Sequence, residues 1–217
     1  MLDSIEICSA PHPDASIIWL HGLGADGSDF VPIAQELSLP INVRYVFPHA
    51  PVMPVTINGG YVMPAWYDIF DNDIAGNQDE VGIRVSAAAL DALVEQEQFR
   101  GIAANRIVLA GFSQGGAVAL QAALRYPEKL AGVLALSTYL PLAEKLEVEK
   151  SACNLAISVF MAHGVADTVI PLAAASRSRQ KLDAQGYAVE WHEYSMAHSV
   201  CPQEIDDIRR FLLEVLG

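Results

Sequence analysis

Short, mainly apolar runs alternate with longer segments of helical spacing along most of this chain. The runs expected to form buried strands are 16–20, 42–47, 107–109, 130–137, 155–161 and 188–194. The segments expected to form helices are 30–37, 81–98, 117–124, 172–185 and a final helix that begins at Pro202. Strands that alternate with helices predict an α/β fold with a mostly parallel central sheet and helices on both faces.

The segment 52–78 interrupts this alternation. It contains Pro54, Pro64 and the pair Gly59-Gly60, so we expect a long non-helical excursion. A loop of this length in a compact domain usually has a function, and a wall or lid over a binding site is the favoured one here. Its apolar side chains could equally cap the hydrophobic core.

The stretch around Ser113 carries the strongest chemical signal. The strand 107–109 leads into Gly111-x-Ser113-x-Gly115, and a helix follows. This spacing is typical of a nucleophile elbow, in which glycines permit a tight turn and the serine hydroxyl stands above the sheet at a helix N-terminus. The pattern alone also fits an ordinary glycine turn, but the flanking strand and helix favour a nucleophile.

A second glycine-rich loop, His21-Gly22-Leu23-Gly24, follows the strand 16–20. It lacks the Lys-Ser/Thr pair of a phosphate-binding loop and the spacing of a dinucleotide fingerprint. We therefore interpret it as an oxyanion loop. The backbone N–H groups of Leu23 and Gln114 are the two predicted donors.

Composition narrows the class of protein. A length of 217 residues favours one domain that spans residues 1–217. The net charge of −13 disfavours nucleic acid and anionic membrane surfaces as partners. The N-terminal residues do not resemble a signal peptide, and no apolar run is long enough to span a bilayer, so no stable membrane insertion is expected. Three cysteines without a C-x-x-C motif predict a cytoplasmic location.

The order of residues selects a base and an acid. Hydrolases of this architecture carry serine, then aspartate or glutamate, then histidine. Of the six histidines, His198 is the one on a loop just after the last strand, whereas His192 lies within that strand. Between Ser113 and His198, Asp167 is the acid that leaves the carboxyl end of a strand. Asp167 could also be only a turn residue, but the predicted triad is Ser113, Asp167 and His198.

The ordered set of motifs resembles the acyl-protein thioesterase/bacterial carboxylesterase family. The motifs are His21-Gly22-Leu23-Gly24, Phe47-Pro48-His49-Ala50-Pro51, Trp66-Tyr67-Asp68-Ile69, Gly111-Phe112-Ser113-Gln114-Gly115-Gly116, His163-Gly164 with Asp167 and Pro171, and His198-Ser199-Val200-Cys201. The resemblance covers nearly the whole chain. It implies an α/β-hydrolase with the same triad, no cofactor or metal, and activity on carboxylic esters or thioesters of lipid-like acyl groups. It also implies that the chain can form a homodimer.

The favoured function is a serine hydrolase that cleaves small-molecule carboxylic esters with small-to-medium acyl chains. One alternative is an acyl-protein thioesterase or lysophospholipase acting on long acyl groups, and another is a non-catalytic binding protein of the same fold. The residues expected to line the acyl site are Met63, Trp66, Tyr67, Tyr139 and Leu140.

Overall fold

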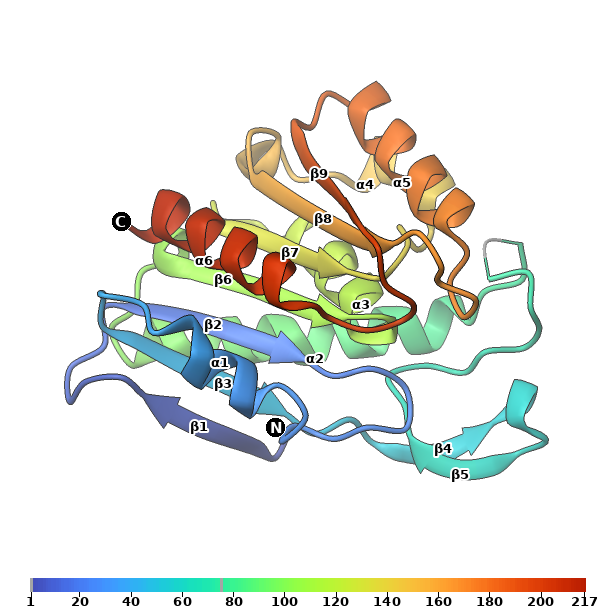
Figure 1. The fold of residues 1–217 in the computed structure, drawn as a ribbon, viewed down its shortest axis with the longest axis horizontal. Coiled ribbons are helices and arrows are strands. Elements are labelled where there is room, and N and C mark those ends of the chain that lie inside the picture. The colour runs from blue at the N-terminus through green and yellow to red at the C-terminus, as the bar shows by residue number, and fades with distance from the viewer. Residues whose placement is uncertain (1, 75) are drawn as a thin grey trace.

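The computed structural model describes residues 2–74 and 76–217. Its centre is a seven-stranded sheet with the strand order β1-β3-β2-β6-β7-β8-β9 (Figure 1). The strands are β1 (Ser4–Cys8), β2 (Ala15–Leu20), β3 (Val43–Pro48), β6 (Ile107–Phe112), β7 (Gly132–Leu136), β8 (Ser158–Gly164) and β9 (Val189–Tyr194). All neighbouring pairs are parallel except β1 with β3. The predicted mostly parallel α/β sheet is confirmed.

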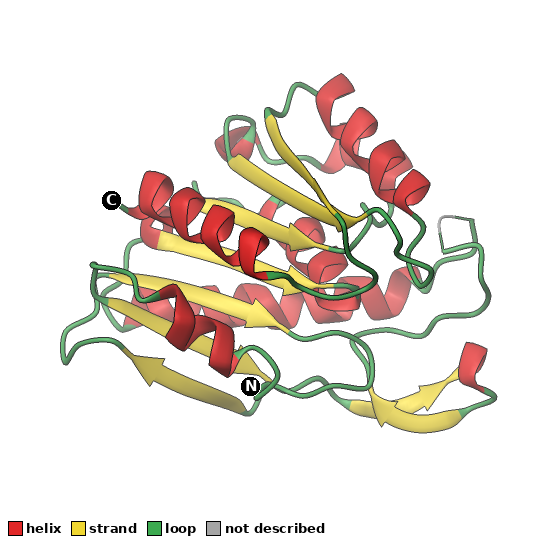
Figure 2. Cartoon of the chain, viewed as in Figure 1, coloured by secondary structure: helices red, strands yellow, loops and turns green. Residues whose placement is uncertain are grey.

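Helices cover both faces of the sheet (Figure 2). The helices are α1 (Val31–Leu37), α2 (Glu80–Phe99), α3 (Gln114–Ala123), α4 (Leu146–Glu149), α5 (Leu172–Ala184) and α6 (Pro202–Leu216). Side chains of α2, α3 and α5 share one hydrophobic cluster with the sheet, and side chains of α1 and α6 share the other. Among the described residues, no helix combines the length and apolar character needed to cross a bilayer.

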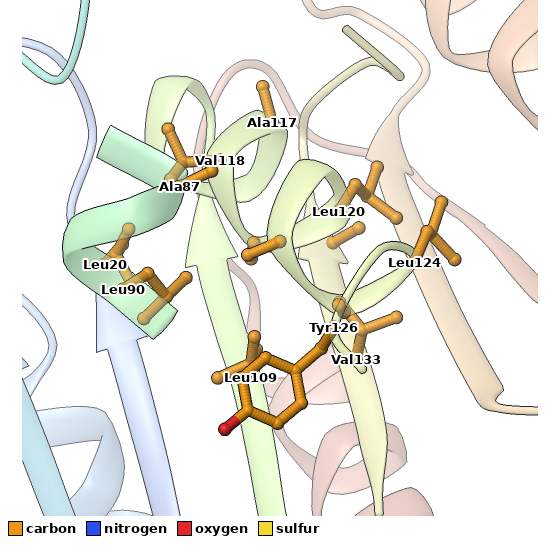
Figure 3. Close-up of a cluster of buried hydrophobic side chains, with 14 of the residues drawn as sticks. Leu20, Ala87, Leu90, Leu109, Ala117, Val118, Leu120, Leu124, Tyr126 and Val133 are labelled. Atoms are coloured by element: carbon orange, nitrogen blue, oxygen red, sulfur yellow. The ribbon is translucent and has the colours of Figure 1, made fainter. Parts of the chain in front are cut away.

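The two clusters follow from the two-residue period of a strand. In β6, Ile107 and Leu109 point to the α2/α3 side, whereas Val108 and Ala110 point to the α1/α6 side. A strand buried on both faces is continuously apolar, and this is why short apolar runs identified the strands. Figure 3 shows α3 packed over the sheet through small and branched side chains.

The structure adds two features to the predicted pattern. β1 was not predicted; it is a half-exposed edge strand, and its alternation of buried and exposed residues is weak. The excursion 52–78 was expected as an irregular loop, but it contains the antiparallel hairpin of β4 (Val52–Val55) and β5 (Tyr61–Pro64), with a short 3-10 helix between them. Gly59 and Gly60 both have positive φ angles, so these glycines turn the chain between the two strands.

The bounds of β8 also differ from the sequence-based prediction. β8 begins at Ser158 rather than 155, because Ala152–Asn154 form a turn of 3-10 helix. It continues through His163 and Gly164, which were expected to lie in a loop.

The parallel strands bring distant loops to one edge of the sheet. In the pairing register, Leu20 lies beside Gly111, Phe112 beside Leu136, and Gly164 beside Tyr194. The segments that follow these strand ends therefore begin side by side, and this is the edge at which ligands bind in such sheets.

Candidate active site

Ser113 occupies a strained turn between β6 and α3. Its backbone angles are φ 55° and ψ −121°, a conformation that a non-glycine residue rarely adopts. The turn is held by hydrogen bonds: Ser113 N–H donates to Leu136 O (2.8 Å), and Thr138 Oγ1 donates to Ser113 O (2.6 Å). Strain of this kind persists only where the surrounding structure enforces it, and it is typical of a nucleophile elbow.

The glycines of the motif are required by close backbone packing. A Cβ atom at Gly111 would lie 2.3 Å from the carbonyl group of Gly115, and a Cβ at Gly115 would lie 2.5 Å from the carbonyl oxygens of Leu20 and His21. A side chain at Gly111 would push the start of α3 away from β6, and one at Gly115 would push the elbow away from the end of β2. The Gly-x-Ser-x-Gly spacing is therefore explained by steric constraints in this fold.

Asp167 and His198 are joined by a short hydrogen bond. Nδ1 of His198 lies 2.7 Å from Oδ2 of Asp167, whose carboxylate is fully buried. Because an ionised carboxylate only accepts, Nδ1 carries the proton and Nε2 is left as the basic nitrogen. The imidazole ring also lies 4.7 Å, centroid to centroid, from the ring of Phe112, the residue before Ser113. The base predicted from sequence thus lies beside the elbow.

Asp167 is also a turn residue. Its Oδ1 atom accepts hydrogen bonds from the backbone N–H groups of Val169 (2.8 Å) and Ile170 (2.9 Å). The turn interpretation of Asp167 therefore applies to Oδ1, and Oδ2 is the oxygen that contacts His198. The two turn bonds fix the carboxylate so that Oδ2 faces His198.

His163 is a second histidine at this carboxylate that was not predicted from the sequence. Its Nε2 lies 2.8 Å from Ile170 O and 3.3 Å from Asp167 Oδ2. Burial lowers the pKa of His163, although the bond to Ile170 opposes that shift. A neutral His163 with its proton on Nε2 donates to the turn that carries Asp167. The spacing His163-x-x-x-Asp167 was available in the sequence, but His163 was placed in a loop rather than in β8.

The glycine-rich loop lies directly against the elbow. A Cβ built at Gly22 would be 3.5 Å from Cβ of Ser113, so this backbone borders the nucleophile. The next N–H, that of Leu23, makes no hydrogen bond to any described residue. Gln114 is the first residue of α3, and N–H groups in a first helical turn have no partner within the helix. Of the two predicted oxyanion donors, Leu23 thus follows the glycine that borders Ser113, and Gln114 follows Ser113 itself.

His21 holds this loop in place. Ala50 N–H donates to Nε2 of His21 (3.1 Å), so the proton must be on Nδ1, which donates to Gly22 O (2.7 Å). Burial is the main cause that lowers the pKa of His21, which favours the neutral ring that these bonds require. This role was not predicted, because it depends on a contact with a segment 29 positions away.

The residues expected to line an acyl site occupy different environments. Trp66, Tyr67, Tyr139 and Leu140 are almost fully buried and belong to the hydrophobic core. Capping of the core, the alternative left open for the excursion 52–78, therefore applies to Trp66 and Tyr67. The hydroxyl groups of Tyr67 and Tyr139 are 2.8 Å apart. Met63 is half-buried in β5, and its sulfur would lie 3.6 Å from a Cβ built at Gly24.

A cavity of about 440 Å³ is lined by residues of the segments 74–80, 139–145 and 174–181. Tyr139, Leu140, Leu142 and Ala174 form its apolar part, and charged side chains including Lys145, Arg177 and Lys181 lie around it. Tyr139 directly follows Thr138, which donates to Ser113 O. Neither Ser113, Asp167 nor His198 lines the cavity, so it does not contain the predicted triad.

The side chain of Gln114 has contacts that were not expected from the sequence, where only its backbone N–H was assigned. It is buried, and its amide bonds to the backbone of Trp66 and Tyr67. Nothing local in the sequence indicates this, because the partners are 48 and 47 positions away.

Comparison with known proteins identifies the family. The Phospholipase/Carboxylesterase family model matches residues 3–216. Acyl-protein thioesterase 1 of Cryptococcus neoformans is 41% identical over 221 residues, which cover 93% of this chain and 92% of the relative. The crystal structure of Zea mays acyl-protein thioesterase 2 superposes with a TM-score of 0.87 at 29% identity, covering all of both chains. Arabidopsis thaliana SOBER1 gives 0.89 at 28% identity, covering 94% of this chain and 99% of that one. The chain belongs to the phospholipase/carboxylesterase family of α/β-hydrolases and is a thioesterase- or carboxylesterase-type hydrolase of acyl esters.

Proposed function

We propose that the chain hydrolyses carboxylic esters through a Ser113-His198-Asp167 triad and an acyl-enzyme intermediate. The observation that carries the proposal is the Asp167–His198 hydrogen bond beside the strained Ser113 elbow. A binding protein without catalysis has no need of this combination. The relatives, which are named thioesterases, likewise speak against the non-catalytic alternative considered from the sequence.

Acylation begins with proton transfer. Nε2 of His198 takes the proton of the Ser113 hydroxyl as Oγ attacks the ester carbonyl carbon, because a neutral hydroxyl is a weak nucleophile. Asp167 keeps the imidazole in the required tautomer and stabilises the imidazolium that forms. The N–H groups of Leu23 and Gln114 donate to the oxygen as it becomes negative. The imidazolium then protonates the leaving alkoxide, and the C–O bond breaks.

Deacylation repeats the same steps with water. His198 removes a proton from a water molecule as its oxygen attacks the acyl-enzyme carbonyl. The tetrahedral intermediate uses the same two donors, and its collapse returns the proton to Ser113 Oγ with release of the carboxylic acid. No cofactor or metal enters either half-reaction.

We propose small-to-medium acyl chains as the preferred substrates. The apolar cavity wall formed by Tyr139 and Leu140 starts one residue beyond Thr138, which is bonded to Ser113, and it supports an apolar acyl site next to the nucleophile. Each methylene that becomes buried contributes about 0.8 kcal/mol. Accordingly, kcat/KM is expected to rise about fourfold per carbon from acetate until the site is full.

The second candidate is an acyl-protein thioesterase or lysophospholipase acting on long acyl groups. It is favoured by the name acyl-protein thioesterase 1 that the 41% identical relative carries. The net charge of −13 supports soluble esters over anionic membrane lipids as substrates.

The test is a series of p-nitrophenyl esters from acetate to palmitate, measured beside a palmitoyl-peptide thioester. A rise in kcat/KM from acetate to a medium-chain optimum supports the first candidate. If the palmitoyl thioester is hydrolysed faster than every oxygen ester, the thioesterase candidate replaces the carboxylesterase candidate. A flat or falling series from acetate contradicts the apolar acyl site.

The compartment and the assembly state are also proposals. Cys8, Cys153 and Cys201 are free thiols in the structure, which supports a reducing compartment such as the cytoplasm. A homodimer remains a proposal from the family resemblance, and sedimentation velocity tests it.

A further inference from the structure

We propose that the side chain of Gln114 is a positioning residue that sets the distance between the two halves of the oxyanion hole. The inference rests on the proposed function, because it concerns the same two backbone donors. It assigns a role to the amide group of Gln114 that is separate from the role of its N–H.

Gln114 bonds to two consecutive backbone groups of one segment. Its Oε1 accepts from Trp66 N–H (2.8 Å), and its Nε2 donates to Tyr67 O (2.6 Å). The residue is only 2% exposed, so water cannot replace either bond. One side chain here must present an acceptor and a donor that are bonded to the same carbon, and a neutral amide does so at any pH.

Trp66 continues the connection to the glycine-rich loop. Its indole Nε1 donates to His21 O (2.8 Å), and its ring lies 5.2 Å from the His21 imidazole. His21 in turn donates from Nδ1 to Gly22 O, immediately before Leu23. Ser86 Oγ donates to Trp66 O and fixes the segment to α2.

These contacts form a continuous path between the two predicted oxyanion donors. It runs from the Gln114 backbone, through the Gln114 side chain, Trp66 and His21, to the N–H of Leu23. The elbow also touches the end of β2 directly, since Gly115 packs against the carbonyl oxygens of Leu20 and His21. Direct packing sets the closest approach of the two halves, and the Gln114–Trp66–His21 path prevents them from separating.

The proposed consequence is catalytic. A transition-state oxygen must reach both donors at once, and an error of about 1 Å in such positioning can cost about 100-fold in rate. Loss of the amide leaves Trp66 N–H and Tyr67 O buried without partners, so the segment would shift to find others. The effect is expected in kcat and kcat/KM together, because the interaction is made in the transition state.

The first test compares Gln114→Met with Gln121→Met. Both replace a buried glutamine of α3 with an apolar side chain of similar length. The hydrogen bonds to Trp66 and Tyr67 come from Gln114, whereas Oε1 of Gln121 has no hydrogen-bond partner among the described residues. Gln114→Met should lower kcat for p-nitrophenyl butyrate about 10-fold to 100-fold, whereas Gln121→Met should stay within about twofold. Assays are run well below the melting temperature of each variant.

The second test uses Gln114→Glu as a pH-dependent replacement. A protonated carboxyl can accept from Trp66 N–H and donate to Tyr67 O, but an ionised one cannot donate. Burial raises the pKa of a carboxyl, so the protonated form is accessible near neutral pH. Ionisable groups near this segment are His21, His198, Asp68 and Asp79. Activity is divided by that of the wild type at each pH, which removes pH effects that the two proteins share. Gln114→Glu should exceed Gln114→Met at pH 6, and this advantage should disappear by pH 9.

Three results would overturn the inference. They are a kcat of Gln114→Met within about twofold of the wild type, an equal loss in Gln121→Met, and a Gln114→Glu variant no better than Gln114→Met at any pH. If Gln114→Met does not fold, Trp66→Phe opens the same path by removing the indole N–H that donates to His21 O, and an unchanged kcat in that variant also overturns the inference. Failure of the proposed triad mechanism would give a different result, because Ser113→Ala would then retain activity.

Discussion

The Nδ1 atom of His198 lies 2.7 Å from Oδ2 of Asp167, although 31 positions separate the two residues in the chain. β8 and β9 are neighbouring parallel strands, so the loops that follow them begin at the same edge of the sheet. The pair is therefore a direct result of the topology. It gives the imidazole a defined tautomer before any substrate binds.

Asp167→Asn should lower kcat by about 10⁴ with little effect on folding. The amide oxygen can keep the turn bonds to Val169 and Ile170, whereas the NH₂ group would face Nδ1 and favour the wrong tautomer of His198. Steady-state kinetics together with circular dichroism measure both effects. Asp183→Asn, at an exposed position on α5, is the control and should be silent. A loss below about tenfold would mean that another carboxylate orients the base.

His163→Gln should make the protein less sensitive to acid. Burial lowers the pKa of His163 in the folded state, whereas the unfolded residue has a pKa of about 6.5. The unfolded state therefore binds more protons as the pH falls below about 6.5, and the folded state loses stability there. Glutamine retains an N–H donor for Ile170 O but does not titrate. Melting temperatures are measured at pH 8, 6.5 and 5.5. The melting temperature of the variant relative to that of the wild type should increase as the pH falls, and a constant difference would contradict this explanation.

Glu204→Gln should stabilise the protein at high pH rather than at low pH. Glu204 is fully buried in the first turn of α6, and burial raises its pKa to about 8. The unfolded carboxyl ionises above about 4.3 while the folded one stays protonated, so the wild type loses stability as the pH rises from about 4.3 to 8. At pH 8.5 the variant should melt several degrees higher than the wild type, and at pH 4.5 the two proteins should have nearly the same melting temperature. Equal melting temperatures at pH 8.5 would show that the carboxyl is hydrated or paired in solution.

Much of this fold could be predicted because its strands are buried on both faces. β6 is continuously apolar, and the glycines after it have a steric cause that is independent of distant sequence. The order of serine, aspartate and histidine along a parallel sheet then restricts the candidates, because each must follow a strand. The predicted Asp167 and His198 are accordingly brought together in the structure.

The features that were missed depend on partners far away in the sequence. β1 is an edge strand with one neighbour, so its sequence shows only a weak alternation of apolar and polar residues. The Gln114 amide and the His21 ring are polar groups whose importance comes from burial against Trp66, Tyr67 and Ala50. No local pattern distinguishes them from other polar side chains. Such contacts support a site that the sequence identifies only by its reacting groups.

The most direct test of the account is to identify the residue that carries the acyl group. The protein is labelled with a fluorophosphonate, digested and analysed by mass spectrometry, and Ser113→Ala is assayed in parallel. We expect a single adduct on Ser113, no labelling of Ser113→Ala, and loss of ester hydrolysis in that variant. An adduct on another residue, with Ser113→Ala still active, would contradict it.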